Sequence, residues 1–352
     1  MFVQDASKKA DNRNVIIWLW AILVMVALMV VIGGVTRLTH SGLSMADWRP
    51  LMGTIPPLTE SDWIETFAKY QETPQYKLVN KNMTIAEFKG IFFWEYIHRL
   101  WGRLIGLVVL LPWLVFYFRK KLSPKLNRRI AILFGLGAVQ GFLGWYMVQS
   151  GLVDKPYVSH YRLAAHLSLA YVVLGLTFWT ILGLRRRGEN TRAVVPSWLR
   201  IFAHSLALLV CLQLFYGALM SGLKAGLGNN TFPTMSGQWF PSGFAILQPF
   251  MRNFIDNNVA VQFIHRTLGW LMIFGSVAFW YAAQSCSLNR FQNMSAIALL
   301  VSVTLQFLLG VFTLIYIVPL GLAIAHQVGA MLVFLSVILV MYSLKKIGPQ
   351  VP

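Results

Sequence analysis

The sequence has few charged residues and very little cysteine. Charged residues occupy 12% of the 352 positions, whereas hydrophobic residues occupy 57%, a balance unlike that of a soluble globular domain. The two cysteines, Cys211 and Cys286, lie in or beside apolar segments and not in the connections expected to face outward. A framework of disulfide bonds is therefore not expected, and the composition indicates a protein embedded in a membrane.

The hydrophobic residues gather into eight segments, each long enough for a transmembrane helix, which needs roughly 20 mainly apolar residues. We therefore predict an all-α integral membrane protein with eight transmembrane helices. The first segment is too long for a signal peptide and lacks a small-residue cleavage site. The segments cover about residues 15–36, 91–118, 130–150, 163–184, 199–222, 259–283, 295–317 and 322–343.

Acidic residues are also scarce, with 12 against 30 lysines and arginines. The basic residues concentrate in alternate connections, such as "RKKLSPKLNRR" at 119–129 and "RRRGENTR" at 185–192. By the positive-inside rule these connections and both termini are cytoplasmic. The basic clusters then meet anionic lipid, so membrane lipids and not nucleic acids are the expected partners.

The chain contains an internal repeat. "EYIHRLWGRLIGL" (95–107) resembles "QFIHRTLGWLMIF" (262–274), and "VQGFLGW" (139–145) resembles "LQFLLGV" (305–311). The predicted halves are residues 1–190 and 191–352, with four helices each. Since four is even, the second half enters the membrane in the orientation of the first. We expect two tandem four-helix bundles related by a pseudo-two-fold axis along the membrane normal.

The predicted outer loop 37–94 is too long for a simple turn. Within "TESDWIETFAKYQETP" (59–74), Trp63, Phe67 and Tyr70 recur at helical spacing, which predicts a short helix on the outer surface. "TIAE" (84–87) is a capping box, so the next helix is expected to begin outside the bilayer.

Four histidines fall inside the even-numbered helices, at similar depth near the outer face. An ionisable side chain within a membrane costs at least about 2.5 kcal/mol unless it faces protein and has a partner. One such histidine could simply bond to a backbone carbonyl, but a duplicated set favours metal ligation. Zinc sites prefer additional thiolate or carboxylate ligands, whereas two histidines on facing helices suit the axial positions of a haem iron. The four are His98, His166, His265 and His326.

Arginines accompany these histidines. Arg99 and Arg266 directly follow His98 and His265. They are candidate partners for haem propionates, which need cations in a low-dielectric setting. Arg37 and Arg103 are further candidates. The alternative is that each arginine anchors a helix end at the membrane interface.

Glu95 is the only acidic residue within the eight segments, and Gln262 takes its place in the second half. It precedes His98 by three residues, so the two share a helix face. A carboxylate there could stabilise positive charge or move a proton at a bound ligand. The alternative is a structural ion pair with Arg99 or Arg103. The asymmetry predicts that the first half carries out chemistry and the second carries electrons.

In combination and order, these motifs resemble the haem A synthase family over nearly the whole chain. The family oxidises the C8 methyl group of haem O to a formyl group by successive hydroxylations, which makes it an oxidoreductase acting on a CH group, and its product haem A serves cytochrome c oxidase. The resemblance rests on "GGVTRLTHSGLSMADWRPLMGTIPP" (33–57), "EYIHRLWGR" (95–103), "QGFLGWYMVQSGL" (140–152), "YRLAAHL" (161–167), "NTFPTM" (230–235), "QFIHRTLGW" (262–270) and "AHQVGA" (325–330).

The resemblance implies a role for each half. The first pair of histidines would face the substrate haem O, the second pair would ligate haem b, and Glu95 would be important for catalysis. Some members carry a cysteine pair in outer loops, which this chain lacks, so it resembles the proteobacterial and mitochondrial branch. The implied location is a bacterial inner membrane with haem sites toward the periplasm. Implied partners are an electron carrier, haem O synthase, the cytochrome c oxidase assembly pathway and a further copy of the chain.

Two other functions use the same features. A dihaem b-type cytochrome linked to quinol would use the four histidines but give Glu95 no chemical task. A transporter built on a parallel repeat would need no iron, yet the sequence shows no broken helices near the midplane, where such proteins bind their substrates.

Overall fold

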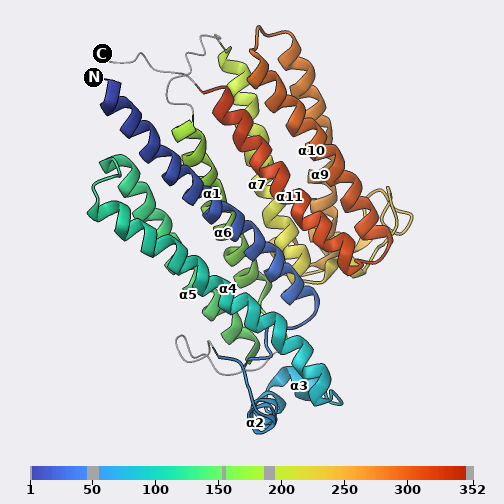
Figure 1. The fold of residues 1–352 in the computed structure, drawn as a ribbon. Coiled ribbons are helices and arrows are strands. Elements are labelled where there is room, and N and C mark those ends of the chain that lie inside the picture. Colours follow the sequence, from blue (N-terminus) through green and yellow to red (C-terminus); the bar gives the residue numbers. More distant parts are fainter. Residues whose placement is uncertain (1, 46–54, 153–155, 186–194, 346–352) are drawn as a thin grey trace. The chain divides into compact units, whose positions relative to one another are not determined.

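The structure is a computed structural model that describes residues 2–45, 55–152, 156–185 and 195–345 (Figure 1). In these ranges the regular elements are helices, which confirms the predicted all-α class. Eight of them have 24 residues or more. These are α1 (Phe2–Leu38), α4 (Ile85–Phe118), α5 (Pro124–Leu152), α6 (His160–Arg185), α7 (Ser197–Gly222), α9 (Asn258–Gln284), α10 (Arg290–Ile315) and α11 (Leu320–Ser343).

Seven of these long helices are apolar enough to cross a membrane, so the prediction of a multi-pass membrane protein is confirmed. The remaining one, α9, has 27 residues. It is not among the seven, and its first half carries the polar residues Gln262, His265 and Arg266. The eighth span therefore stays a prediction, and so does the pseudo-two-fold axis.

Contacts divide the chain into two compact units, Met1–Thr177 and Phe178–Pro352. This boundary falls inside α6, whereas the sequence repeat puts it after that helix, at residue 190. The assignment of one haem site to each half stays a prediction.

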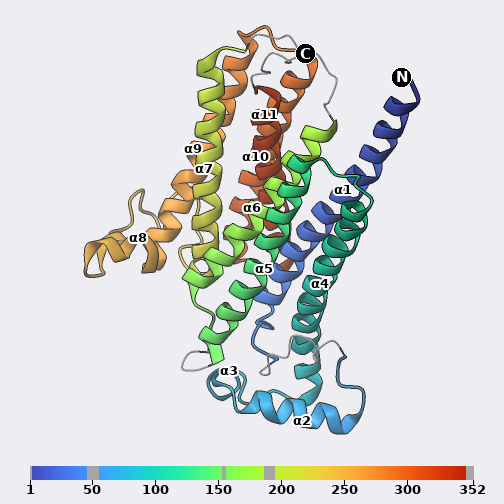
Figure 2. The same ribbon diagram turned by 90° about the vertical axis from the view of Figure 1, so that its left-hand side faces the viewer.

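In unit 1, α1 and α4 lie side by side (Figures 1 and 2). Tryptophan side chains fasten them to each other: the indole N–H of Trp18 donates to the carbonyl oxygen of Val108 at 2.7 Å, and that of Trp101 donates to Met25 at 2.9 Å. Such bonds satisfy backbone and indole groups that lipid cannot. The helix pair is therefore joined along its length by polar contacts as well as by packing.

Two short helices precede α4 in the chain, α2 (Glu60–Gln71) and α3 (Pro74–Leu78), and α2 packs against α4 (Figure 2). The predicted capping box at Thr84 opens α4, and a further capping box at Thr59 opens α2. Tyr70 of α2 stacks on Phe88 of α4 with ring centres 5.0 Å apart, and both side chains are fully buried. The predicted amphipathic helix thus exists, and its aromatic face packs on α4.

In unit 2, α7 packs on α9 and α10 packs on α11. The connection from α7 to α9 contains the short helix α8 (Asn253–Asp256) and three 3₁₀ turns. Asn253 is fully buried and donates to the carbonyl oxygens of Leu247 and Phe250 at 2.9 and 2.8 Å. Asn257 caps α9 by accepting from the backbone N–H of Val259. These bonds fix the connection onto the start of α9. The turns are η2 (Ala225–Leu227), η3 (Ser242–Ala245) and η4 (Phe250–Arg252).

Candidate functional site

The four predicted histidines form one pair in each unit. His98 on α4 and His166 on α6 lie close enough for charge on one to act on the other, and so do His265 on α9 and His326 on α11. All four side chains are partly buried. Among the described residues no three His, Cys, Asp or Glu side chains gather around one metal ion. A haem iron requires only two axial protein ligands, which each pair can supply.

Each histidine lies against a glycine on the preceding long helix. A Cβ atom added at any of these glycines would come within 3.2 Å of the imidazole ring, closer than ordinary van der Waals contact. A larger residue would therefore push the ring out of place. The pairs are Gly33 with His98, Gly144 with His166, Gly217 with His265, and Gly310 with His326.

Three of the histidines also meet a glutamine that lies one helical turn before the glycine. The amide nitrogen lies 3.3 Å from the Nε2 atom of His166 and 3.4 Å from those of His265 and His326. The three glutamines are Gln140, Gln213 and Gln306, in the order of these histidines. On α1 the position four residues before Gly33 is occupied by Met29.

Polar atoms in these three clusters are left without partners. The Nδ1 atoms of the three histidines and the Oε1 atoms of the three glutamines are buried and form no hydrogen bond in the described part of the chain. An unsatisfied buried polar atom costs about 1–3 kcal/mol. The same arrangement occurs three times, so it is a repeated feature of the sites. A ligand that offers a metal to an imidazole nitrogen fits this set of atoms.

Glu95 fastens α4 to the segment that follows α1. Its carboxylate is 2% exposed and accepts from the hydroxyl of Ser44 at 2.7 Å and from the backbone N–H of Met45 at 2.8 Å. Arg99 donates both to this carboxylate and to the carbonyl oxygen of Met45. The ion pair between Glu95 and Arg99, the alternative raised from the sequence, is thus formed. Two residues after α1, Ser44 and Met45, also bind to it, which the sequence did not suggest.

In unit 2 the equivalent residues of α9 also form hydrogen bonds with a neighbouring loop, but the donor and acceptor roles differ. Gln262 is fully buried and donates to the carbonyl oxygen of Gly228 at 2.8 Å. Arg266 donates to three loop carbonyl oxygens at 2.9–3.0 Å, those of Thr231, Pro233 and Thr234. The connection from α7 to α9 thus presents a carbonyl oxygen to Gln262. The segment that follows α1 instead presents N–H and O–H donors to Glu95. This difference is a structural reason for the exchange of glutamate for glutamine between the halves.

The predicted arginines lie at different places in this arrangement. Arg266 has a buried Nη1 atom with no hydrogen-bond partner. It can therefore donate to an anionic group in addition to the carbonyl oxygens of the connection from α7 to α9. Arg37 lies in the last turn of α1, and Arg103 lies one turn beyond Arg99 on α4.

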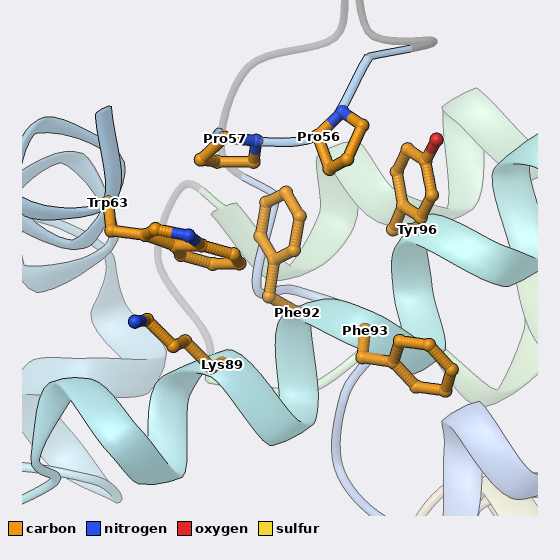
Figure 3. A pocket seen from close by; sticks show the side chains of 7 residues that line it. All are labelled: Pro56, Pro57, Trp63, Lys89, Phe92, Phe93 and Tyr96. Carbon is orange, nitrogen blue, oxygen red and sulfur yellow. The ribbon is translucent and has the colours of Figure 1, made fainter. Parts of the chain in front are cut away.

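A cavity of about 390 Å³ opens between α2 and α4 (Figure 3). Its walls are aromatic: Trp63 points at Phe92, with ring centres 5.1 Å apart, and Lys89 places its ammonium 5.1 Å from the Trp63 ring. Phe92 and Tyr96 flank Glu95 on α4. The lining consists of Pro56, Pro57, Trp63, Lys89, Phe92, Phe93 and Tyr96.

The three glutamines are not among the residues predicted from the sequence. A signal was present, since "QGFLG" (140–144), "QLFYG" (213–217) and "QFLLG" (306–310) each precede a helix that carries one of the histidines. A glutamine inside an apolar helix has no obvious partner until the facing helix is known.

Comparisons with known proteins show the family of the chain. The family model described as COX15-CtaA, cytochrome oxidase assembly protein, matches residues 16–338. The chain is 44% identical to the haem A synthase of Nitrosospira multiformis over 342 residues, which cover 96% of each chain. It is 46% identical to the haem A synthase of Nitrosomonas eutropha over 327 residues, or 92% of each chain. With that of Rhodopseudomonas palustris the identity is 44%, over 96% of this chain and 92% of the relative. The chain therefore belongs to the COX15-CtaA family of cytochrome oxidase assembly proteins and is a homologue of the curated haem A synthases.

Proposed function

We propose that the protein is a haem A synthase, which oxidises the C8 methyl group of haem O to a formyl group and so acts as an oxidoreductase on a CH group. The observation that carries this proposal is homology to haem A synthases at 42–46% identity over more than nine tenths of the chain. Two pairs of partly buried histidines in a helical membrane protein support it, since each pair suits one haem.

Unit 1 is proposed to bind the substrate haem O through His98 and His166, and unit 2 to bind haem b through His265 and His326. The glycines opposite the rings leave room for the imidazoles, and three Nδ1 atoms lack any other partner. When bound, haem b supplies one-electron redox chemistry. The protein orients the ligands and keeps lipid and bulk water away from them.

Glu95 is the proposed catalytic residue. It lies one turn from His98 on the same face of α4, and no other acidic residue occurs in the predicted spans. Its negative charge would stabilise positive charge that develops at the methyl group, and it would take up a proton from the water that adds there. Ser44, Met45 and Arg99 hold the carboxylate in place for this task.

Arginines are proposed to bind the haem propionates. Arg266 is supported by its unpartnered Nη1 atom, and Arg99 occupies the equivalent position in unit 1. Arg37 and Arg103 remain candidates for the same task by their places on α1 and α4.

The proposed location is a bacterial inner membrane, crossed eight times by two tandem four-helix bundles. Both termini would be cytoplasmic, and the haem sites would lie toward the periplasm. The alternate basic connections support this orientation. An electron carrier, haem O synthase, the cytochrome c oxidase assembly pathway and a second copy of the chain are the proposed partners.

Haem analysis tests the proposal. The protein, purified from cells that also make haem O, is extracted with acid and acetone, and its haems are separated by chromatography. Haem B together with haem O or haem A is expected. Haem B alone would favour the dihaem cytochrome instead, and a preparation without stoichiometric iron would favour the transporter.

A further inference from the structure

One helix-pair arrangement occurs four times in the described chain, and one of its copies differs. In each copy a glycine faces a histidine on the next long helix, and the residue four positions before that glycine also points toward this helix. Three copies use glutamine at the first position, and the copy on α1 uses Met29. Met29 occupies an equivalent place: its methyl carbon lies 3.3 Å from a Cβ added at Gly102, as the amide of Gln213 lies 3.7 Å from one added at Gly269.

The glutamines can hold the histidine rings in one orientation by hydrogen bonds. A buried amide offers both a donor and an acceptor, and the amides of Gln213 and Gln306 lie 3.4 Å from their rings. Gln140 also donates to the backbone carbonyl of His166 at 3.0 Å. The unpartnered Oε1 atoms are available to accept the N–H of an imidazole whose other nitrogen binds a metal. Such outer partners fix the ring and raise ligand basicity, and losing one typically costs about 10–100-fold in metal affinity.

Methionine cannot provide this support. A thioether has no hydrogen to donate and is a weak acceptor, and its unbranched chain is flexible. The His98 ring is also turned differently, because its Nε2 atom faces Gly33, whereas the other three rings turn Cε1 toward their glycines. His98 is thus the one histidine of the four without an amide at this position.

We infer that Met29 makes His98 the exchangeable haem ligand of the protein, and that Gln140, Gln213 and Gln306 are positioning residues for the three retained ligands. This rests on the proposed function, in which unit 1 must take up haem O and release haem A while unit 2 keeps its haem. In unit 1, His98 would lack a hydrogen bond that holds its ring, whereas His166 would have one. The haem could then dissociate from His98 first while His166 still binds it.

The test measures haem release from the full-length holoprotein. Wild type and Met29→Gln are mixed with excess apomyoglobin, transfer is followed by absorbance, and the haems captured are identified by chromatography. Haem O and haem A report on unit 1, and haem B reports on unit 2. Met29→Gln is expected to slow release from unit 1 about 10-fold or more, in line with the effect of outer partners on metal affinity. It is also expected to reduce carbon monoxide binding by the reduced unit 1 haem.

Three further variants sharpen the result. Gln306→Met places a thioether in unit 2 and is expected to speed haem B release about 10-fold. Met25→Gln puts the same amide one turn away on α1 and is expected to leave release unchanged. Met29→Leu separates packing from hydrogen bonding, since it fills the space but offers no amide.

Equal release from wild type and Met29→Gln would overturn the inference, as would equal slowing by Met29→Leu or unchanged release from Gln306→Met. If Met29→Gln does not fold, Gln306→Met still decides the matter, because it removes polar atoms from an apolar setting. Failure of the proposed function would look different: the wild-type protein would bind no haem O and form no haem A. A wild type that makes haem A while all variants release haem equally refutes only the inference.

Discussion

Glu95 holds Met45 by its backbone, with the N–H of Met45 donating to the carboxylate at 2.8 Å. One turn further along α4, Arg99 takes the carbonyl oxygen of the same residue at 3.0 Å. Both backbone groups of one loop residue are thus bound by α4. The carboxylate proposed for the reaction therefore also shapes the segment that follows α1, and an experiment on Glu95 must separate these two roles.

Replacing Glu95 tests both roles. Glu95→Ala removes the acceptor for Ser44 and Met45, so we expect loss of haem A formation and faster proteolysis after α1. Glu95→Gln keeps one acceptor oxygen but loses the charge, so haem A formation should fall while the loop stays protected. Haem A formed per haem O is measured at equal protein levels, together with limited proteolysis. Undiminished conversion in Glu95→Ala would remove this residue from the mechanism.

Gly310→Ala should disturb the haem of unit 2. The added methyl group would lie 2.9 Å from the Cε1 atom of His326, so the ring must move. We expect haem B affinity to fall by about 10-fold or more, the scale of a disturbed metal ligand, and haem B content per protein measures it. Gly321→Ala on α11 is the matched control, because nothing lies within 4 Å of its added carbon. Equal haem B content in both variants would contradict the proposed ligand role of His326.

Phe88→Ala should loosen α2 from α4. The Phe88 side chain is fully buried against Tyr70 and Phe67, and removal of such a ring costs about 3–5 kcal/mol. We expect protease cleavage around α2 to accelerate while haem content stays high. Ile64→Ala on α2 is the control, since that side chain is 57% exposed. Similar cleavage of both variants would show that the aromatic cluster does not hold α2.

The start of α2 should respond to acid through Asp62. The backbone N–H of Thr59 and the Thr59 hydroxyl, followed by the N–H of Leu58, hold the pKa of this exposed carboxyl below its usual value. A lowered folded pKa means that the carboxylate stabilises the cap above the unfolded value of about 3.9. That contribution is lost as the pH falls through the folded pKa. Trp63 fluorescence should therefore show an acid transition below about pH 4 that is absent in Asp62→Asn.

The sequence alone singled out the histidines, the arginines and Glu95 as candidates, because a polar residue inside an apolar run stands out. It also predicted α2 from the helical spacing of Trp63, Phe67 and Tyr70, and it predicted the capping box at Thr84, which opens α4 by local hydrogen bonds that need no tertiary knowledge. The hydrogen bond between Gln262 and Gly228 could not be foreseen, because it joins residues 34 positions apart through the path of an irregular loop. The same holds for Gln140, Gln213 and Gln306, whose partners lie on other helices.

The glycine opposite each histidine points to the smallest building block of this protein. Within unit 2 alone, α7 with α9 and α10 with α11 place glutamine, glycine and histidine in the same way. The repeating element within unit 2 is thus a two-helix hairpin. One hairpin supplies a single imidazole. Two hairpins are therefore the minimum that could bind a flat macrocycle from both of its faces. A change at one position of one hairpin is then enough to make two otherwise alike sites unequal.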